Sequence, residues 1–296
     1  MFWVWFHIFV VAMIFLDLKG FHKDEKAITL KSAISVSAFW VLIALGFNFY
    51  VLLSLGKEPA LTFFTAYLLE TSLSVDNLFV ILSIFSFFQI EPRYQNKVLY
   101  LGVLGAFACR IFFILIGISL LEMVHWMYIV FGVILCSSAV FLYRQKEESN
   151  LRDAWLVRIF MKYLRVDKNP NRGLFWIKRN GKVYVTTLFV SLLLVEASDV
   201  LFAIDSIPAV LAVTSDFFLA YTSNVFAVLG LRSLYFLLVL FHRKFTFLKS
   251  AIIMILFFIG GKMILIPFWT FSSLFTLGGI ILILVSSYIA FKFKKV

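Results

Sequence analysis

Long apolar runs separated by short polar clusters make up nearly the whole chain. A transmembrane helix needs about 20 consecutive, mostly apolar residues, which these runs provide. The pattern predicts nine transmembrane helices, at residues 1–18, 32–55, 60–88, 98–121, 124–143, 183–213, 217–241, 249–267 and 270–291. The expected fold is therefore that of an all-α, polytopic membrane protein.

Composition supports this interpretation. Of the 296 residues, 62% are hydrophobic and only 15% are charged, whereas soluble domains have about 25% charged residues. A soluble globular protein is therefore excluded, and the lipid bilayer is the expected partner. The net charge of +11 does not indicate nucleic-acid binding, because Lys and Arg gather in the cytoplasmic loops of membrane proteins. Cys109 and Cys136 lie inside apolar runs, so no disulfide framework or thiolate metal site is expected.

The basic residues predict the orientation of the helices. With the N-terminus outside and the C-terminus inside, 23 of the 27 Lys and Arg residues lie on the cytoplasmic side, as the positive-inside rule requires. The one long connection, residues 144–182, is rich in both residue types and is expected to be cytoplasmic. It divides the chain into two halves.

Carboxylates inside the predicted spans carry the strongest functional signal. Each charged side chain at mid-membrane costs about 2.5–3.5 kcal/mol, so such residues are retained for a reason. There are six in this sequence: Asp17, Glu70, Asp76, Glu196, Asp199 and Asp205. Asp17 stands at a span end beside Lys19 and is expected to reach the interface. The other five lie near the middles of the third and sixth spans, where we expect the chemistry.

These two spans resemble each other. Residues 70–77 align with residues 199–206, because each segment has two acidic residues six apart followed by a small polar residue. Downstream, residues 103–110 and 228–232 each contain Val-Leu-Gly followed by an arginine. The third and sixth spans cross the membrane in opposite directions, so spans 3–5 and 6–8 are expected to be inverted three-helix repeats.

The repeat predicts five parts of the chain. Two accessory helices come first, and one helix with a basic tail comes last. The expected boundaries are 1–55 for the accessory helices, 56–143 for the first repeat, 144–182 for the basic cytoplasmic loop, 183–267 for the second repeat and 268–296 for the last helix and tail.

The spacing of the acidic residues also suggests a local geometry. Residues six apart on an unbroken helix point about 120° away from each other, and Pro208 cannot donate a backbone hydrogen bond. We therefore expect unwound turns near residues 76–77 and 205–208. Glu196 and Asp199, three apart, can reach one site from a single helical face. Freed carbonyls beside carboxylates would form an all-oxygen site, which suits hard cations such as Mn²⁺, Mg²⁺ or Ca²⁺.

Basic residues inside the spans have two interpretations. Arg110 and Arg232 either pair with carboxylates and hold the repeats together, which we favour, or contact the substrate directly. Asn224 is a further candidate ligand, and Lys262 is expected to extend to the interface. The carboxylates outnumber these cations, so the interior attracts cations and can take up protons when an ion leaves.

Three motifs resemble the TerC family of integral membrane proteins: residues 70–80, 195–209 and 221–236. The resemblance implies inverted three-helix repeats, a location in the bacterial inner membrane, and a link to Mn²⁺ export and tellurite resistance. Mn²⁺ would be the transported substrate, and no cofactor is implied. The resemblance to the family also implies a set of metal ligands, namely Glu70, Asp76, Asn77, Glu196, Asp199, Asp205 and Ser206.

The leading hypothesis is a secondary transporter that exports Mn²⁺ or another hard divalent cation by alternating access, and not an enzyme. The alternative is a membrane-protein insertion or assembly factor, or a tellurite-resistance factor, without ion transport. An intramembrane aspartyl protease is disfavoured because the Gly-x-Gly-Asp element is missing around Asp76 and Asp205. The sequence leaves open the metal, proton exchange, the direction of transport, and whether the chain forms homo-oligomers or binds other membrane proteins.

Overall fold

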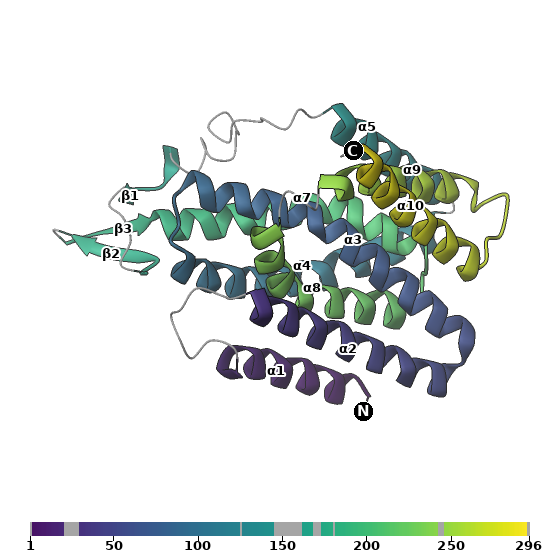
Figure 1. Ribbon diagram of the computed structural model, residues 1–296, viewed down its shortest axis with the longest axis horizontal. Coiled ribbons are helices and arrows are strands. Elements are labelled where there is room, and N and C mark those ends of the chain that lie inside the picture. Colours follow the sequence, from purple (N-terminus) through teal and green to yellow (C-terminus); the bar gives the residue numbers. More distant parts are fainter. Residues whose placement is uncertain are drawn as a thin grey trace.

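Helices dominate the computed structural model, which describes residues 2–20, 30–124, 126–144, 162–167, 173–179, 181–241 and 246–294 (Figure 1). Nine long helices lie within these ranges. They are α1 (Phe2–Gly20), α2 (Leu30–Leu55), α3 (Lys57–Phe87), α4 (Pro92–Met123), α5 (Met127–Arg144), α7 (Thr187–Leu211), α8 (Phe217–Phe241), α9 (Thr246–Leu265) and α10 (Ser273–Lys294).

The predicted spans correspond one to one with these helices. Eight are long and apolar enough to cross a membrane, and α1 is apolar over Val4–Met13, the part whose side chains are described. This confirms the all-α, polytopic fold. The largest difference is at α4, which begins at Pro92 and not at residue 98. Proline at the first helical position has no hydrogen bond to lose, so the helix starts before its apolar run.

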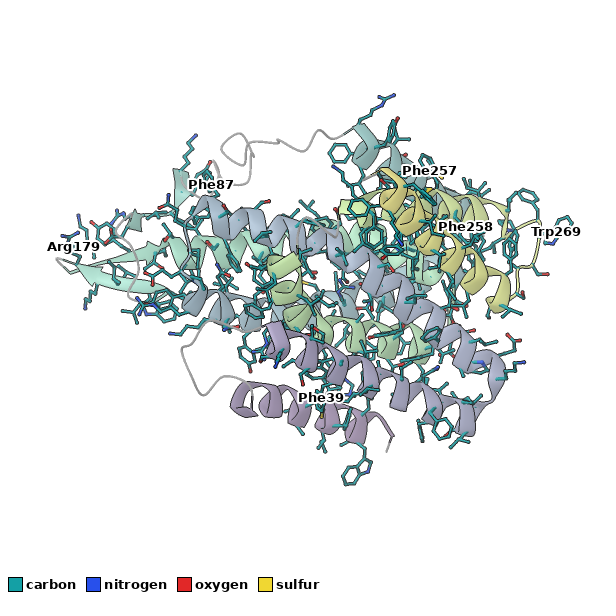
Figure 2. The ribbon with its side chains drawn as sticks, viewed as in Figure 1. Phe39, Phe87, Arg179, Phe257, Phe258 and Trp269 are labelled. Carbon is teal, nitrogen blue, oxygen red and sulfur yellow. The ribbon has the colours of Figure 1, made fainter. Side chains whose placement is uncertain are left out.

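Large apolar side chains on α2, α4 and α10 face outward, as lipid requires. The side chains of Leu53, Phe112 and Leu282 are each more than half exposed. All three belong to apolar helices long enough to cross a membrane. Figure 2 shows Arg179 and Trp269 at opposite ends of the molecule. Trp269, in the α9–α10 connection, is 70% exposed, as suits an aromatic anchor at the membrane interface.

A small sheet, which the sequence pattern did not predict, interrupts the all-α architecture. Its strands β1 (Val166–Asp167), β2 (Trp176–Arg179) and β3 (Lys182–Thr186) have the order β1-β3-β2. β2 and β3 are antiparallel, β1 and β3 parallel. The signal was an Asn-Gly pair at 180–181, typical of two-residue hairpins, and Gly181 has φ of 73°. The basic connection thus contains a folded segment at one end of the bundle (Figure 1).

The packing of the helices has the symmetry expected of two repeats. α3 packs on α8 and α4 packs on α7, while α5 packs on α9, α3 on α7 and α4 on α8. Exchanging α3, α4 and α5 with α7, α8 and α9 maps this set of contacts onto itself. α3 and α7 run in opposite directions (Figure 1), which is the arrangement of an inverted repeat. The outer helices α2 and α10 cover this core. α2 packs on α3 and α8, whereas α10 packs on α9 and α3.

The predicted unwound turns are wrong. α3 and α7 are continuous helices through residues 76–77 and 205–208. In α3, Ser72 donates its hydroxyl to the carbonyl of Leu68 at 2.7 Å, and so adds to the helical hydrogen bonding without opening it. Pro208 lies near the end of α7, where the missing N–H removes one bond from a helix that ends at Leu211.

Thr186 joins the sheet to α7. It is the N-cap residue, and its hydroxyl accepts a bond from the backbone N–H of Phe189 at 3.4 Å and donates to the carbonyl of Leu174 at 2.7 Å. Because a lost N-cap costs about 1 kcal/mol, Thr186→Val should lower the free energy of unfolding by about that amount, whereas Thr186→Ser should retain it. Unfolding of the two purified variants in detergent measures this difference, and equal stabilities would contradict the role of the hydroxyl.

Candidate metal-binding and ion-pair site

Arg110 of α4 lies at the centre of a buried polar cluster. Its side chain is 2% exposed and pairs with Glu70 of α3, which is fully buried. The same nitrogen, Nη1, donates to Oδ1 of Asn224 on α8 at 3.0 Å. Nη2 donates to Oδ1 of Asp199 on α7 at 3.5 Å. One guanidinium therefore connects four helices, two from each repeat.

The surroundings of this cluster are apolar. Leu69 and Leu73 beside Glu70, and Ala106 and Ile114 on either side of Arg110, are buried. In such an environment charged groups persist only when they are paired, because the cost of desolvation is several kcal/mol per ion. The position of Glu70 opposite Arg110 meets this requirement.

The pairing is nevertheless incomplete. Four buried polar atoms of the cluster have no hydrogen-bond partner among the described residues, namely Glu70 Oε2, Asp199 Oδ2, Arg110 Nε and Asn224 Nδ2. A bidentate arginine–carboxylate pair would use both oxygens of one carboxylate. Here the guanidinium takes one oxygen from each of two carboxylates and leaves the other oxygen of each unbonded.

A second pair of carboxylates lies on the same two helices. Among charged groups, Lys249 of α9 acts most strongly on Asp76 of α3, and Asp205 of α7 acts on it more weakly. Ser138 of α5 donates to Oδ1 of Asp205 at 2.5 Å. Both carboxylates are only partly buried. The two pairs come from equivalent positions of the sequence repeat, Glu70 with Asp199 and Asp76 with Asp205.

Glu196 rests on a glycine of the neighbouring helix. A Cβ atom at Gly105 of α4 would lie 2.0 Å from Oε2 of Glu196, so only glycine leaves room for the carboxylate in this position. The close contact with Glu196 therefore explains why the Val-Leu-Gly motif at residues 103–105 ends in glycine.

A pocket opens beside the cluster, between α3, α4, α7 and α8. Its empty volume, counted together with the open solvent at its mouth, is about 470 Å³. Most of its lining is apolar, and the polar lining consists of Asn77, Ser198, Asp199 and Arg232. Asp199 therefore belongs both to the arginine cluster and to the wall of the pocket.

Comparison with known proteins identifies the family. The model of the integral membrane protein TerC family matches residues 55–295, which contain both carboxylate pairs and Arg110. The chain belongs to the TerC family.

Relatives of this TerC protein are similar over nearly their whole length. An uncharacterized membrane protein of Myxococcus xanthus is 44% identical over 267 residues, covering 90% of this chain and 84% of the relative. The protein called membrane-bound redox modulator Alx of Escherichia coli (strain K12) is 40% identical over 298 residues, covering 97% and 92%. An uncharacterized membrane protein of Rickettsia bellii is 39% identical over 261 residues, covering 88% and 86%. No solved structure matches the chain significantly.

The candidate metal ligands of this TerC protein do not form one cage. Within the described ranges, no three Asp, Glu, His or Cys side chains are placed to share a single metal ion. Glu70 and Asp199 contact Arg110, Asp76 and Asp205 form the second pair, Glu196 packs on Gly105, Asn77 lines the pocket, and the hydroxyl of Ser206 is buried without a hydrogen bond. Because α3 and α7 are unbroken, acidic residues six apart cannot all face one point.

Three other predicted residues have clear positions. Arg232 is buried and lines the pocket. Lys262 does not extend to the interface: its side chain is buried, and Nζ donates to the carbonyl of Ala212 at 2.8 Å, just beyond the end of α7. A cation satisfies the free carbonyls there. The side chain of Asp17 lies outside the described residues.

Ser138 and Lys249 were not among the site residues predicted from the sequence. Ser138 follows another serine inside an apolar run, where a hydroxyl was a weak signal. Lys249 is one of the 23 basic residues that the sequence places on the cytoplasmic side, and it lies at the start of a predicted span. Their role becomes visible only when α5 and α9 are packed against α3 and α7.

Proposed function

We propose that this TerC family protein is a secondary transporter of hard divalent cations in the bacterial inner membrane, with Mn²⁺ exported from the cytoplasm by alternating access, and that it is not an enzyme. The observation that carries the proposal is the presence of four carboxylates at equivalent positions of two central, oppositely directed helices. They are Glu70 and Asp76 on α3, and Asp199 and Asp205 on α7. Ionisable side chains inside a membrane protein are costly and mark ion pathways.

The donor atoms support a hard cation. An oxygen of Asp205 accepts a hydrogen bond from the hydroxyl of Ser138, and Asp76 supplies further carboxylate oxygens from α3. Oxygen donors suit Mn²⁺, Mg²⁺ and Ca²⁺, whereas Zn²⁺ and Cu⁺ prefer histidine nitrogen or sulfur. When the metal leaves, protons can neutralise the same carboxylates, which would couple export to proton uptake.

The helix arrangement supports alternating access. In transporters with inverted repeats, the substrate binds at the interface of the repeats near the midplane, and one repeat rocks against the other. Here Glu70 and Asp199 lie near the middles of α3 and α7, and Asp76 and Asp205 lie six residues farther along each helix.

One observation favours the alternative, a factor without ion transport. Arg110 pairs with residues of three other helices, which by itself would hold a static bundle together. The two functions differ in whether purified protein moves an ion.

Flux of Mn²⁺ into proteoliposomes tests the proposal. Purified protein should give protein-dependent uptake, with Mg²⁺ and Ca²⁺ as competitors that rank selectivity and with a proton gradient imposed in each direction. Empty liposomes are the control. Folded protein that moves no Mn²⁺ under any gradient would contradict transport and support the assembly factor.

Gly105 provides a further test near Glu196. Gly105→Ala should push the Glu196 carboxylate aside at small cost in stability, because the clashing atoms are the end of a flexible side chain. We expect a several-fold loss of Mn²⁺ flux with an unchanged unfolding temperature. Gly46→Ala is the control, because no atom lies within 4 Å of its added Cβ. Equal fluxes for the two variants would remove Glu196 from the transport path.

A further inference from the structure

The hydrogen bonds of Arg110 are unusual for a purely structural ion pair. Its guanidinium bridges Glu70 and Asp199 through one oxygen each, and Oε2 of Glu70 and Oδ2 of Asp199 are buried without a partner in the part of the chain that the structure describes. Each unsatisfied buried group costs about 1–3 kcal/mol. The bond to Asp199, at 3.5 Å, is also at the outer limit of a hydrogen bond. The network is therefore poorly satisfied on the side of Asp199.

The guanidinium takes the position of a cation between the two repeats. Glu70 and Asp199, with Arg110 between them, keep one net negative charge when all three are ionised. A divalent ion held by the same two carboxylates would leave no net charge, and their unbonded oxygens are available as ligands. The pair thus fits a divalent cation better than it fits the arginine.

The pocket gives a cation access to this position. Asp199 lines the pocket together with Asn77 and Arg232, and its side chain is 12% exposed, whereas Glu70 is fully buried. A cation that enters the pocket would meet Asp199 before Glu70. Asp199 is also the partner that Arg110 holds at the longer distance.

We propose that Arg110 is a tethered counter-ion, which the transported cation displaces from Glu70 and Asp199 and which returns to expel it. The proposal rests on the transport function above. It makes Arg110 a residue that sets affinity and turnover. On displacement, the carboxylate nearest to Asp199 along α7 is Glu196, one helical turn away, and it can receive the guanidinium.

Binding of Mn²⁺ to purified Arg110→Gln tests the competition. While Arg110 is bound to the two carboxylates, the metal cannot bind them. The apparent affinity for Mn²⁺ is therefore reduced by the fraction of protein in which Arg110 has left them. Removing the competitor should therefore lower the Kd for Mn²⁺ by about tenfold or more, while flux at saturating Mn²⁺ falls because the ion is no longer expelled. Arg110→Lys keeps the charge and should stay close to the wild-type Kd.

Lys262→Met is the matched control. Lys262 is also a buried cation, but it bonds Ala212, 13 residues beyond Asp199, or about 20 Å along a helix. Its removal should leave the Kd unchanged. An equal tightening in Lys262→Met would mean that any lost positive charge favours metal binding, and would overturn the specific role of Arg110.

A double variant keeps the test valid if Arg110→Gln does not fold. Glu70→Gln with Arg110→Gln replaces the pair by neutral residues of similar shape, which buried sites tolerate better than a lone charge. It should bind Mn²⁺ more tightly than Glu70→Gln alone, because Arg110 no longer competes for Asp199. Equal or weaker binding would overturn the proposal. A wild-type protein that moves no Mn²⁺ refutes transport itself, whereas a wild type that transports, with no tightening in either Arg110 variant, refutes only the counter-ion.

Discussion

Asp76→Asn and Asp205→Asn should each reduce Mn²⁺ flux in proteoliposomes by about 100-fold. Truncating one partner of a buried charge interaction costs about 2–5 kcal/mol, and every 1.4 kcal/mol is about tenfold in affinity. Asparagine keeps the shape of the side chain and one oxygen ligand, but it removes the charge that attracts a divalent ion. The two variants should therefore fail for the same reason, although they lie in different repeats.

The stability of these variants distinguishes the two functions. Burial opposes the charge of each carboxylate, and Lys249 and Ser138 offset part of this cost, so replacement by neutral asparagine should leave the free energy of unfolding about equal. A static assembly factor would show no flux in the wild type, and its polar residues would act only on folded yield. Glu91→Gln is the control, because Glu91 is an exposed carboxylate paired with Arg93. Unchanged flux in both aspartate variants would contradict the assignment of Asp76 and Asp205 to the transport site.

The sequence predicted the helices well for a physical reason. Every backbone polar group of a membrane span must be bonded within the span, so length and apolarity nearly determine the helix. The hairpin of β2 and β3 was missed because its strands are short and lie in a charged connection, where no apolar periodicity marks them. The pair at residues 180–181 indicated the turn of this hairpin.

The candidate site was predicted in part. Buried carboxylates on α3 and α7 follow from their cost in a membrane, and pairing of Arg110 with a carboxylate follows from the same cost. Which carboxylate it meets does not follow, because Glu70 and Asp199 are 40 and 89 residues away and depend on how the helices pack. The expected unwinding failed because Pro208 lies close enough to the end of α7 that its missing N–H removes only one helical bond, and Ser72 bonds a carbonyl of its own helix.

Gly132→Ala or Gly260→Ala should disrupt the contact between α5 and α9. A Cβ at Gly132 would lie 2.7 Å from the carbonyl oxygen of Gly260, and one at Gly260 would lie 2.9 Å from that of Gly132. Backbone atoms cannot move aside as a side chain can, so the helices must separate. Overpacking of this kind costs about 1–3 kcal/mol, which unfolding of the purified variants in detergent should show.

Gly261→Ala provides a matched control on the same helix. Apart from its own helix, no atom of the described residues lies within 4 Å of its added Cβ, so the variant should be as stable as the wild type or more stable by up to about 1 kcal/mol, because alanine favours helix. If all three variants unfold alike, the close approach of α5 and α9 does not stabilise the fold.

The same contact should matter for transport. α5 carries Ser138, which donates to Asp205, and α9 carries Lys249, which interacts with Asp76. Because the two helices hold opposite partners of one carboxylate pair, separating them should weaken both interactions together. Gly260→Ala should therefore lose Mn²⁺ flux even in the fraction of protein that remains folded, whereas Gly261→Ala should keep it. Full flux in folded Gly260→Ala would show that the Asp76–Asp205 pair works without the support of α5 and α9.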